Sequence, residues 1–161
     1  MFEGKRYWII GASEGLGEAL CHQLADAGAH LILSARSEDK LRVLADALPS
    51  AEALPCDVTD RESVSKAAAS AGTIDGMIYL AGYYDPMKAQ DWDAEAVRRM
   101  CNVNFMGGVN ILGEVAPRFT AQGHGHIVLI GSLAGFRGLP GSIGYGASKA
   151  GLMHMGETLY A

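Results

Sequence analysis

The chain has 161 residues, 49% of them hydrophobic and 21 of them glycine, with a formal net charge of −5 at pH 7. This length predicts a single domain over residues 1–161. No stretch is rich in lysine and arginine, and no apolar run approaches the ~18 residues of a membrane-spanning helix. Nucleic acid and membrane are therefore not expected partners.

The thiol and imidazole side chains predict neither a metal site nor a disulfide. Three cysteines, Cys21, Cys56 and Cys101, are odd in number and widely spaced, which predicts buried, reduced thiols and a cytoplasmic location. His124 and His126 are one residue apart, but no carboxylate or cysteine accompanies them as a further ligand. A surface turn is favoured over a metal pair at this position.

Apolar strands and helical patterns alternate along the chain. Five strands are predicted, at Tyr7–Ile10, Leu31–Leu33, Ala51–Cys56, Ile74–Leu80 and Ile127–Ile130. Helices are predicted over 16–27, 38–48, Arg61–Ala71, about 94–121 and from about Ser142 onward, with irregular segments over 83–93 and 131–141. The alternation predicts right-handed βαβ units and a parallel sheet with helices on both faces. Ligands of such sheets bind outside the carboxyl ends of the strands.

Helical spacing also predicts which side chains face inward. Before a stop at Gly28, the first helix is expected to bury Leu16, Ala19, Leu20, Gln23 and Leu24. After Ser37 as its N-cap, the second is expected to turn inward Leu41, Leu44, Ala45 and Leu48. Either Thr59 or Asp60 is expected to cap the third helix.

Between the first strand and the first helix lies the spacing Gly11-x-x-x-Gly15-x-Gly17. Glycines permit a tight turn and bring backbone N–H groups close to a ligand, and the new helix directs its positive end at the same place. This layout predicts a pyrophosphate site. The alternative is a glycine-rich turn that binds nothing.

Six short motifs then follow one another in order. They are Gly11-x-x-x-Gly15-x-Gly17, Asp57-Val58, Leu80-Ala81-Gly82, Asn102-Val103-Asn104, Ser132, and Tyr145-x-x-x-Lys149. In this order and spacing the chain resembles the short-chain dehydrogenase/reductase family, a branch of the Rossmann fold. The resemblance implies an α/β fold with a doubly wound parallel sheet in the strand order 3-2-1-4-5. Members of the family are longer, so the chain is expected to lack their sixth and seventh strands and C-terminal part.

The resemblance implies a catalytic set of Asn104, Ser132, Tyr145 and Lys149. Tyr145 and Lys149 are four residues apart and share a helix face, and an ammonium beside a phenol favours the phenolate. Tyr145 would then exchange a proton with the substrate oxygen, and Ser132 would donate a hydrogen bond to that oxygen. Asn104 would break the helix and join a proton relay to Lys149. The alternatives are a solvated helix pair for Tyr145 and Lys149, a turn serine for Ser132, and an N-cap or a satisfied buried amide for Asn104.

The resemblance also implies a set of cofactor contacts. It comprises Gly11, Ser13, Glu14, Gly15, Leu16, Gly17, Arg36, Asp57, Val58, Ala81, Gly82, Asn104, Tyr145 and Lys149. Asp57 would meet the adenine amino group, a role compatible with capping the next helix. At the end of the second strand Ala35 replaces the acidic residue typical of NAD binding, and Arg36 suits a 2′-phosphate. NADP is therefore favoured over NAD, although the Glu14 carboxylate would repel that phosphate if it pointed inward.

These observations predict an NADP-dependent oxidoreductase that acts on a small-molecule carbonyl or alcohol and forms a dimer or tetramer. The alternative is a nucleotide-binding module, or an inactive fragment, that binds NAD(P) without turnover. Aromatic side chains after the fourth strand, Tyr83, Tyr84 and Trp92 with Met87, either line a substrate mouth or cover the helix behind them.

Overall fold

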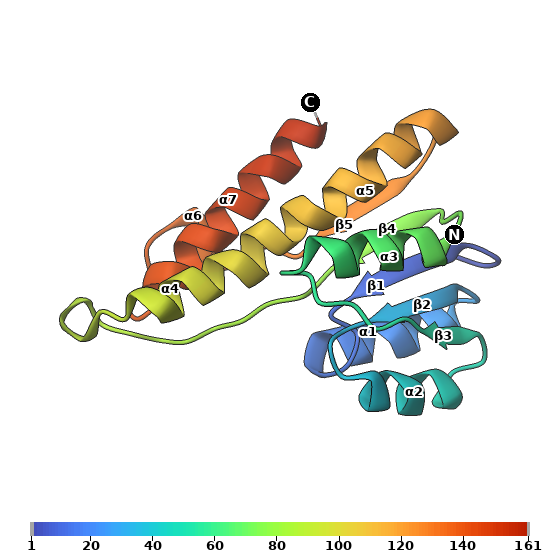
Figure 1. Cartoon of the computed structure of the whole chain (residues 1–161), viewed down its shortest axis with the longest axis horizontal. Coiled ribbons are helices and arrows are strands. Elements are labelled where there is room, and N and C mark those ends of the chain that lie inside the picture. The colour runs from blue at the N-terminus through green and yellow to red at the C-terminus, as the bar shows by residue number, and fades with distance from the viewer. Residues whose placement is uncertain (1, 161) are drawn as a thin grey trace.

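The computed structural model describes residues 2–160 and contains a parallel five-stranded sheet (Figure 1). Its order is β3-β2-β1-β4-β5, as predicted. The strands are β1 (Arg6–Ile10), β2 (His30–Ser34), β3 (Ala51–Ala53), β4 (Gly76–Tyr79) and β5 (His126–Leu129). In the register of the sheet, Tyr7 of β1 lies opposite Leu31 of β2 and Gly76 of β4. All five strands therefore end at one edge of the sheet.

Helices cover both faces of this sheet. One face packs against α1 (Gly15–Asp26) and α2 (Glu38–Ala47), and the other against α3 (Arg61–Ala71), α5 (Gly107–Gln122) and α7 (Ile143–Tyr160). A long rod consists of α4 (Ala94–Cys101), the π-helical segment η2 (Asn102–Met106) and α5, and α7 packs along α4 and η2. Short turns complete the order, with η1 at Ala89–Asp91 and α6 at Leu133–Phe136.

The apolar runs of the sequence explain the two cores. In β1, Trp8 and Ile10 belong to the core under α3 and α5, while Tyr7 and Ile9 belong to the core under α1 and α2. A strand buried on both faces needs such a continuous apolar run, because its side chains alternate between the faces.

The structure tests the predicted buried face of α2 and the predicted N-caps of α2 and α3. The inward face predicted for α2 is confirmed, with Leu41, Leu44 and Leu48 buried and Ala45 half-buried. Asp60, not Thr59, caps α3, since its carboxylate accepts the amide of Glu62 at 2.9 Å. Ser37 occupies the N-cap of α2, but its hydroxyl makes no capping bond.

The inward face predicted for α1 was only partly right: Leu24 is buried and Leu20 half-buried, but Ala19 and Gln23 are exposed. Leu16 is 64% exposed, and the buried residues of this helix are Gly17, Cys21, Leu24 and Ala25. The reason is steric: Gly17 lies directly against Gly11 in the turn, which fixes the rotation of the helix and turns Leu16 outward.

The strands, the rod and the thiols also differ from the predictions in detail. The strands β3 and β4 are shorter than predicted, α6 lies in the segment predicted to be irregular, and Pro117 lies inside α5 without ending it.

Cys21 and Cys56 are buried, and Cys101 is only half-buried. Burial raises the pKa of Cys21 to about 12 and that of Cys56 to about 11, so both thiols stay protonated at neutral pH. Between residues 2 and 160, no helix combines the length and apolarity needed to cross a bilayer.

Candidate active site

The glycine-rich turn lies at the end of β1 and is held from both sides. The amides of Gly11 and Ala12 donate to the carbonyl of Ser34 at 2.7 and 3.1 Å, and a Cβ on Gly11 would lie 2.5 Å from the amide nitrogen of Ala81. A Cβ on Gly17 would lie 1.9 Å from the carbonyl oxygen of Gly11. Only glycine fits at either position, and the backbone of the turn is exposed at the start of α1 as a result.

The N-terminus of α1 is free of side-chain capping. Glu14 occupies the N-cap, yet its carboxylate makes no bond to the first turn of the helix. Its Oε2 instead lies 2.7 Å from Nζ of Lys40 in the first turn of α2. Amides of a first helical turn without a capping side chain are a suitable site for an anion.

Charged groups at the end of β2 lie beside this turn. The Lys40 hydrogen bond holds the pKa of Glu14 below its usual value, with a smaller contribution from the positive charge of Arg36. Arg36 is exposed immediately after the strand, and Ala35 before it is half-buried. The structure thus brings two cations and one carboxylate to one place on the surface.

Asp57 and Val58 lie after β3. The Asp57 carboxylate accepts the amide and the hydroxyl of Thr59 at 2.9 and 2.7 Å, so the alternative role of capping the next helix falls to Asp60 and not to Asp57. The Val58 side chain is buried in the core, and its carbonyl accepts the Asn110 amide at 2.9 Å. Each residue is fixed by its own local bonds.

Lys149 lies at the centre of the site, although it is only 3% exposed. Its Nζ donates to the carbonyl of Ile130, at the end of β5, at 2.8 Å, and lies 5.8 Å from the ring centroid of Tyr145. Burial lowers the pKa of Lys149, because desolvation disfavours its charged form. Lys149 is buried and Tyr145 half-buried on the same helix, α7, so they are no solvated pair.

Ser132 follows β5 and is the N-cap of α6, where its Oγ accepts the amide of Ala134 at 3.2 Å. Glycines allow α6 to pack tightly on α7: a Cβ on Gly146 would lie 2.9 Å from the carbonyl oxygen of Ala134. The segment that carries Ser132 is therefore tied to the helix that carries Tyr145 and Lys149.

Asn104 is fully buried in η2, and its amide is saturated. Its Oδ1 accepts the amide of Tyr83 at 2.6 Å, and its Nδ2 donates to the carbonyl of Tyr83 at 3.0 Å and to Oγ of Ser148 at 2.9 Å. The side chain is thus a satisfied buried amide, and it lies at a helical irregularity, as the family resemblance implied. Gly82 lies close by: a Cβ there would be 3.7 Å from Asn104 Oδ1 and 4.0 Å from Lys149 Nζ.

Sequence reasoning left the role of Tyr84 open and missed Ser148. The ring of Tyr84 lies 4.9 Å from that of Tyr145, between centroids, which places one of the aromatic side chains after β4 at the site. Met87 instead belongs to a small core beside α4. Ser148 also donates to the carbonyl of Tyr145 at 2.8 Å, and its position next to Lys149 in the sequence was the available signal.

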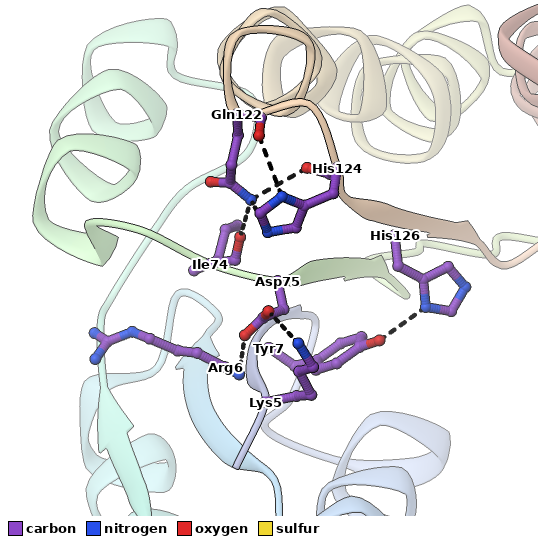
Figure 2. A network of polar contacts seen from close by, with 8 residues as sticks. All are labelled: Lys5, Arg6, Tyr7, Ile74, Asp75, Gln122, His124 and His126. Atoms are coloured by element: carbon purple, nitrogen blue, oxygen red, sulfur yellow. Dashed lines mark hydrogen bonds and ion pairs between the residues drawn. The ribbon is translucent and has the colours of Figure 1, made fainter. Parts of the chain in front are cut away.

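The two histidines near β5 lie at the opposite edge of the sheet. His126 is hydrogen-bonded through Nδ1 to the hydroxyl of Tyr7 at 2.9 Å, and His124 bonds with Gln122 (Figure 2). Within residues 2–160 no three His, Cys, Asp or Glu side chains form a group that could hold a metal ion.

Known proteins share both the sequence and the fold of this chain. The profile of the short chain dehydrogenase family matches residues 5–161. An uncharacterized oxidoreductase of Listeria innocua is 35% identical over 94% of this chain and 64% of its own length. A 3-oxoacyl-[acyl-carrier-protein] reductase of Thermotoga maritima is 36% identical over 97% of this chain and 67% of its length.

Solved structures agree with these relatives. The crystal structure of a putative betaketoacyl-ACP reductase superposes with a TM-score of 0.92 at 29% identity, covering 99% of this chain and 67% of the other. The chain thus spans about two thirds of the length of the proteins it matches. With its sheet order, its family profile and these relatives in agreement, the chain belongs to the short-chain dehydrogenase/reductase family of oxidoreductases.

Proposed function

We propose that this chain carries the cofactor-binding and catalytic part of an NADP-dependent oxidoreductase that acts on a carbonyl or alcohol. The observation that carries the proposal is the buried ammonium of Lys149. It lies one helical turn from Tyr145 and beside Gly82, at the edge where all five strands end. Burial of a charged lysine is costly, and ionisable groups perturbed in this way cluster at functional sites.

The glycine turn fits a dinucleotide. A Cβ at Gly17 or Gly11 would collide with backbone, whereas nothing lies within 4 Å of the position of a Cβ on Gly15, so that glycine faces open space. The pyrophosphate would contact backbone from Gly11 to Gly17, including Ser13 and Leu16. Asp57, Val58 and Ala81 would border the adenosine half, and Asn104 would hold the loop beside the nicotinamide half.

When bound, the cofactor supplies or accepts the hydride. Tyr145 would give its phenolic proton to the substrate oxygen or take one from it, and Lys149 would hold ribose hydroxyls. The Ser132 oxygen already accepts a backbone amide, so its own proton is available to the substrate oxygen. The backbone carbonyl of Asn104, in the irregular segment η2, would hold a water of the proton relay to Lys149.

Charge at the end of β2 supports NADP. No acidic residue stands at Ala35, and Arg36 offers the planar fork that suits a phosphate. The carboxylate of Glu14, next to the second glycine of the turn, is neutralised by Lys40 at 2.7 Å. The Thermotoga relative is named as a 3-oxoacyl-[acyl-carrier-protein] reductase, which supports a carbonyl as the substrate group. Assembly into a dimer or tetramer and a cytoplasmic location stay predictions.

The test is binding and turnover by the full chain and its Tyr145→Phe variant. NADPH at one hundred times its dissociation constant should raise the stability by about 2.7 kcal/mol, a shift of several degrees in the thermal midpoint, and NADH should do so only at higher concentration. Tyr145→Phe should bind NADPH like the wild type and lose roughly 10²–10⁴-fold in turnover of aldehydes and ketones. Tyr7→Phe, at the other edge, serves as the control and should change neither. Equal activity of Tyr145→Phe would overturn the mechanism, and binding without any turnover by the wild type would favour a nucleotide-binding module.

A further inference from the structure

The rod of helices is out of α-helical register at η2. In a regular α-helix the amide of Gly107 would donate to the carbonyl of Val103, four residues earlier. Here it donates to the carbonyl of Asn102, five residues earlier, which is the π-helical pattern. The Val103 carbonyl has therefore lost its α-helical donor, in a part of the chain that is packed against β4 and α7.

Tyr79, the last residue of β4, supplies a donor to that carbonyl. Its ring is fully buried, and its hydroxyl donates to the carbonyl of Val103 at 2.5 Å. Burial holds the pKa of Tyr79 well above its usual value, so the hydroxyl keeps its proton. Gly107 leaves the room for it: a Cβ there would lie 2.4 Å from the Tyr79 oxygen and 2.7 Å from a methyl of Val58.

The register at η2 determines where Asn104 points. Each residue of an α-helix turns the chain by about 100°, so removal of the inserted residue would rotate Asn104 by about that angle relative to α5. Its three bonds, to both backbone groups of Tyr83 and to Ser148 beside Lys149, exist only in the present register. These bonds join the loop after β4 to α7.

We infer that Tyr79 is a positioning residue, whose hydroxyl holds the Val103 carbonyl in the π-helical register and thereby aims the Asn104 amide at Tyr83 and Ser148. The site that this register serves is the one described under the proposed function, on which the catalytic meaning of the inference rests. The Tyr79 hydroxyl bonds to the helix backbone and its ring lies in the core, so it acts on the site through Asn104 and not on substrate or cofactor.

The experiment compares Tyr79→Phe with Tyr7→Phe, each of which removes one hydroxyl from a tyrosine of a neighbouring strand. Amide hydrogen exchange is measured at Tyr83, whose N–H is bonded to Asn104. The reference is Leu80, whose N–H donates to the carbonyl of Ile10 at 2.8 Å. In Tyr79→Phe the exchange at Tyr83 should rise about tenfold while that at Leu80 stays near the wild-type rate. Tyr7→Phe should leave Tyr83 unchanged.

Two further results separate positioning from mere stability. In an Asn104→Ala background, where Tyr83 has already lost its acceptor, Tyr79→Phe should add nothing to the exchange at Tyr83. Tyr79→Phe should also weaken NADPH severalfold while leaving adenosine 2′,5′-bisphosphate, which lacks the nicotinamide half, unaffected.

Exchange that rises equally at Tyr83 and Leu80, or at neither, would overturn the inference. If the wild-type chain binds neither NADPH nor adenosine 2′,5′-bisphosphate, the proposed function fails, and the exchange measurements still decide the role of Tyr79.

Discussion

At the amino edge of the sheet, several polar groups are paired with one another, although within the described residues the buried Nε of Arg6 has no hydrogen-bond partner. Asp75 accepts the Lys5 ammonium and the Arg6 amide, each at 2.9 Å, and the Tyr7 hydroxyl meets His126 at 2.9 Å (Figure 2). These groups fasten β4 and β5 to β1, and a buried polar group that finds a partner within the protein costs little. The amino edge is built for stability.

At the carboxyl edge, the same strands end in groups that stabilise the fold poorly. The first turn of α1 has no capping side chain, and in the described part of the chain the buried Lys149 ammonium has one hydrogen-bond acceptor, the carbonyl of Ile130. Glycines that pack against backbone keep the turn narrow. The difference shows that one sheet separates the two tasks: pairs that hold strands together lie at one edge, and groups left available for a ligand lie at the other.

The largest effect is expected from Gly17→Ala at the carboxyl edge. The new methyl would lie 1.9 Å from the carbonyl oxygen of Gly11, so α1 must move, at a cost on the order of 3 kcal/mol. NADPH binding should be lost in any folded protein that remains. The matched control is Gly113→Ala in α5, where no atom lies within 4 Å of the new methyl and the free energy of unfolding should rise by about 1 kcal/mol. Urea unfolding and an NADPH titration measure both, and a Gly17→Ala protein that binds normally would contradict the steric account of the turn.

The smaller prediction at the amino edge is that Asp75→Asn lowers stability and leaves NADPH binding unchanged. The Arg6 amide and then the Lys5 ammonium hold the pKa of Asp75 below its usual value. A depressed pKa in the folded state means stability that is complete above the unfolded value and is lost as pH falls through the folded value. The variant should therefore be about 1 kcal/mol less stable than the wild type at pH 7. This difference in the free energy of unfolding should shrink as the pH falls below about 4 and Asp75 of the wild type takes up a proton.

The control for this charge change is Asp46→Asn, an exposed carboxylate on α2. It should unfold at the wild-type urea midpoint at both pH values, since surface carboxylates contribute little. A loss of NADPH affinity in Asp75→Asn would show that the two edges are coupled and that the separation of tasks is wrong.

The sequence predicted the sheet and its edge better than the contacts made there. Strand order, the inward face of α2 and the helix break at Asn104 followed from local pattern and family resemblance, and the structure confirms them. The exposed Leu16 and the bond from Tyr79 to Val103 could not be predicted, because each depends on a three-dimensional contact that local sequence pattern does not reveal. Apolar periodicity gives the faces of a helix only when no close backbone contact sets its rotation.

For the same reason, the sequence could not predict which side chains on different helices and loops contact one another. The Glu14 carboxylate was expected to repel the 2′-phosphate of NADP. In the structure it is paired with Lys40, which is 26 positions further along the chain. Tyr84 was noticed among aromatic residues, but only its distance to Tyr145 assigns it to the site. Residue types at the ends of strands can be placed at an edge from the sequence, whereas their pairing requires coordinates.

The smallest effect on stability, and the sharpest on selectivity, is expected from Glu14→Gln. The Glu14–Lys40 pair is exposed, with side-chain accessibilities of 75% and 56%, so its loss should leave the thermal midpoint unchanged. Removal of the carboxylate frees Lys40 and removes a negative charge beside Arg36, so NADPH should bind a few-fold more tightly at low salt and NADH as before.

The matched control is Glu62→Gln, which breaks an equally exposed pair with Lys66 on α3, at 2.6 Å, away from the glycine turn. It should alter neither affinity. The gain in Glu14→Gln should disappear at about 1 M salt, because the Debye length there is about 3 Å. Weaker NADPH binding in Glu14→Gln would mean that the carboxylate holds Lys40 in place for the phosphate. The pair would then belong to the binding groups of the carboxyl edge, in the same way that Asp75 and Lys5 belong to the paired groups of the amino edge.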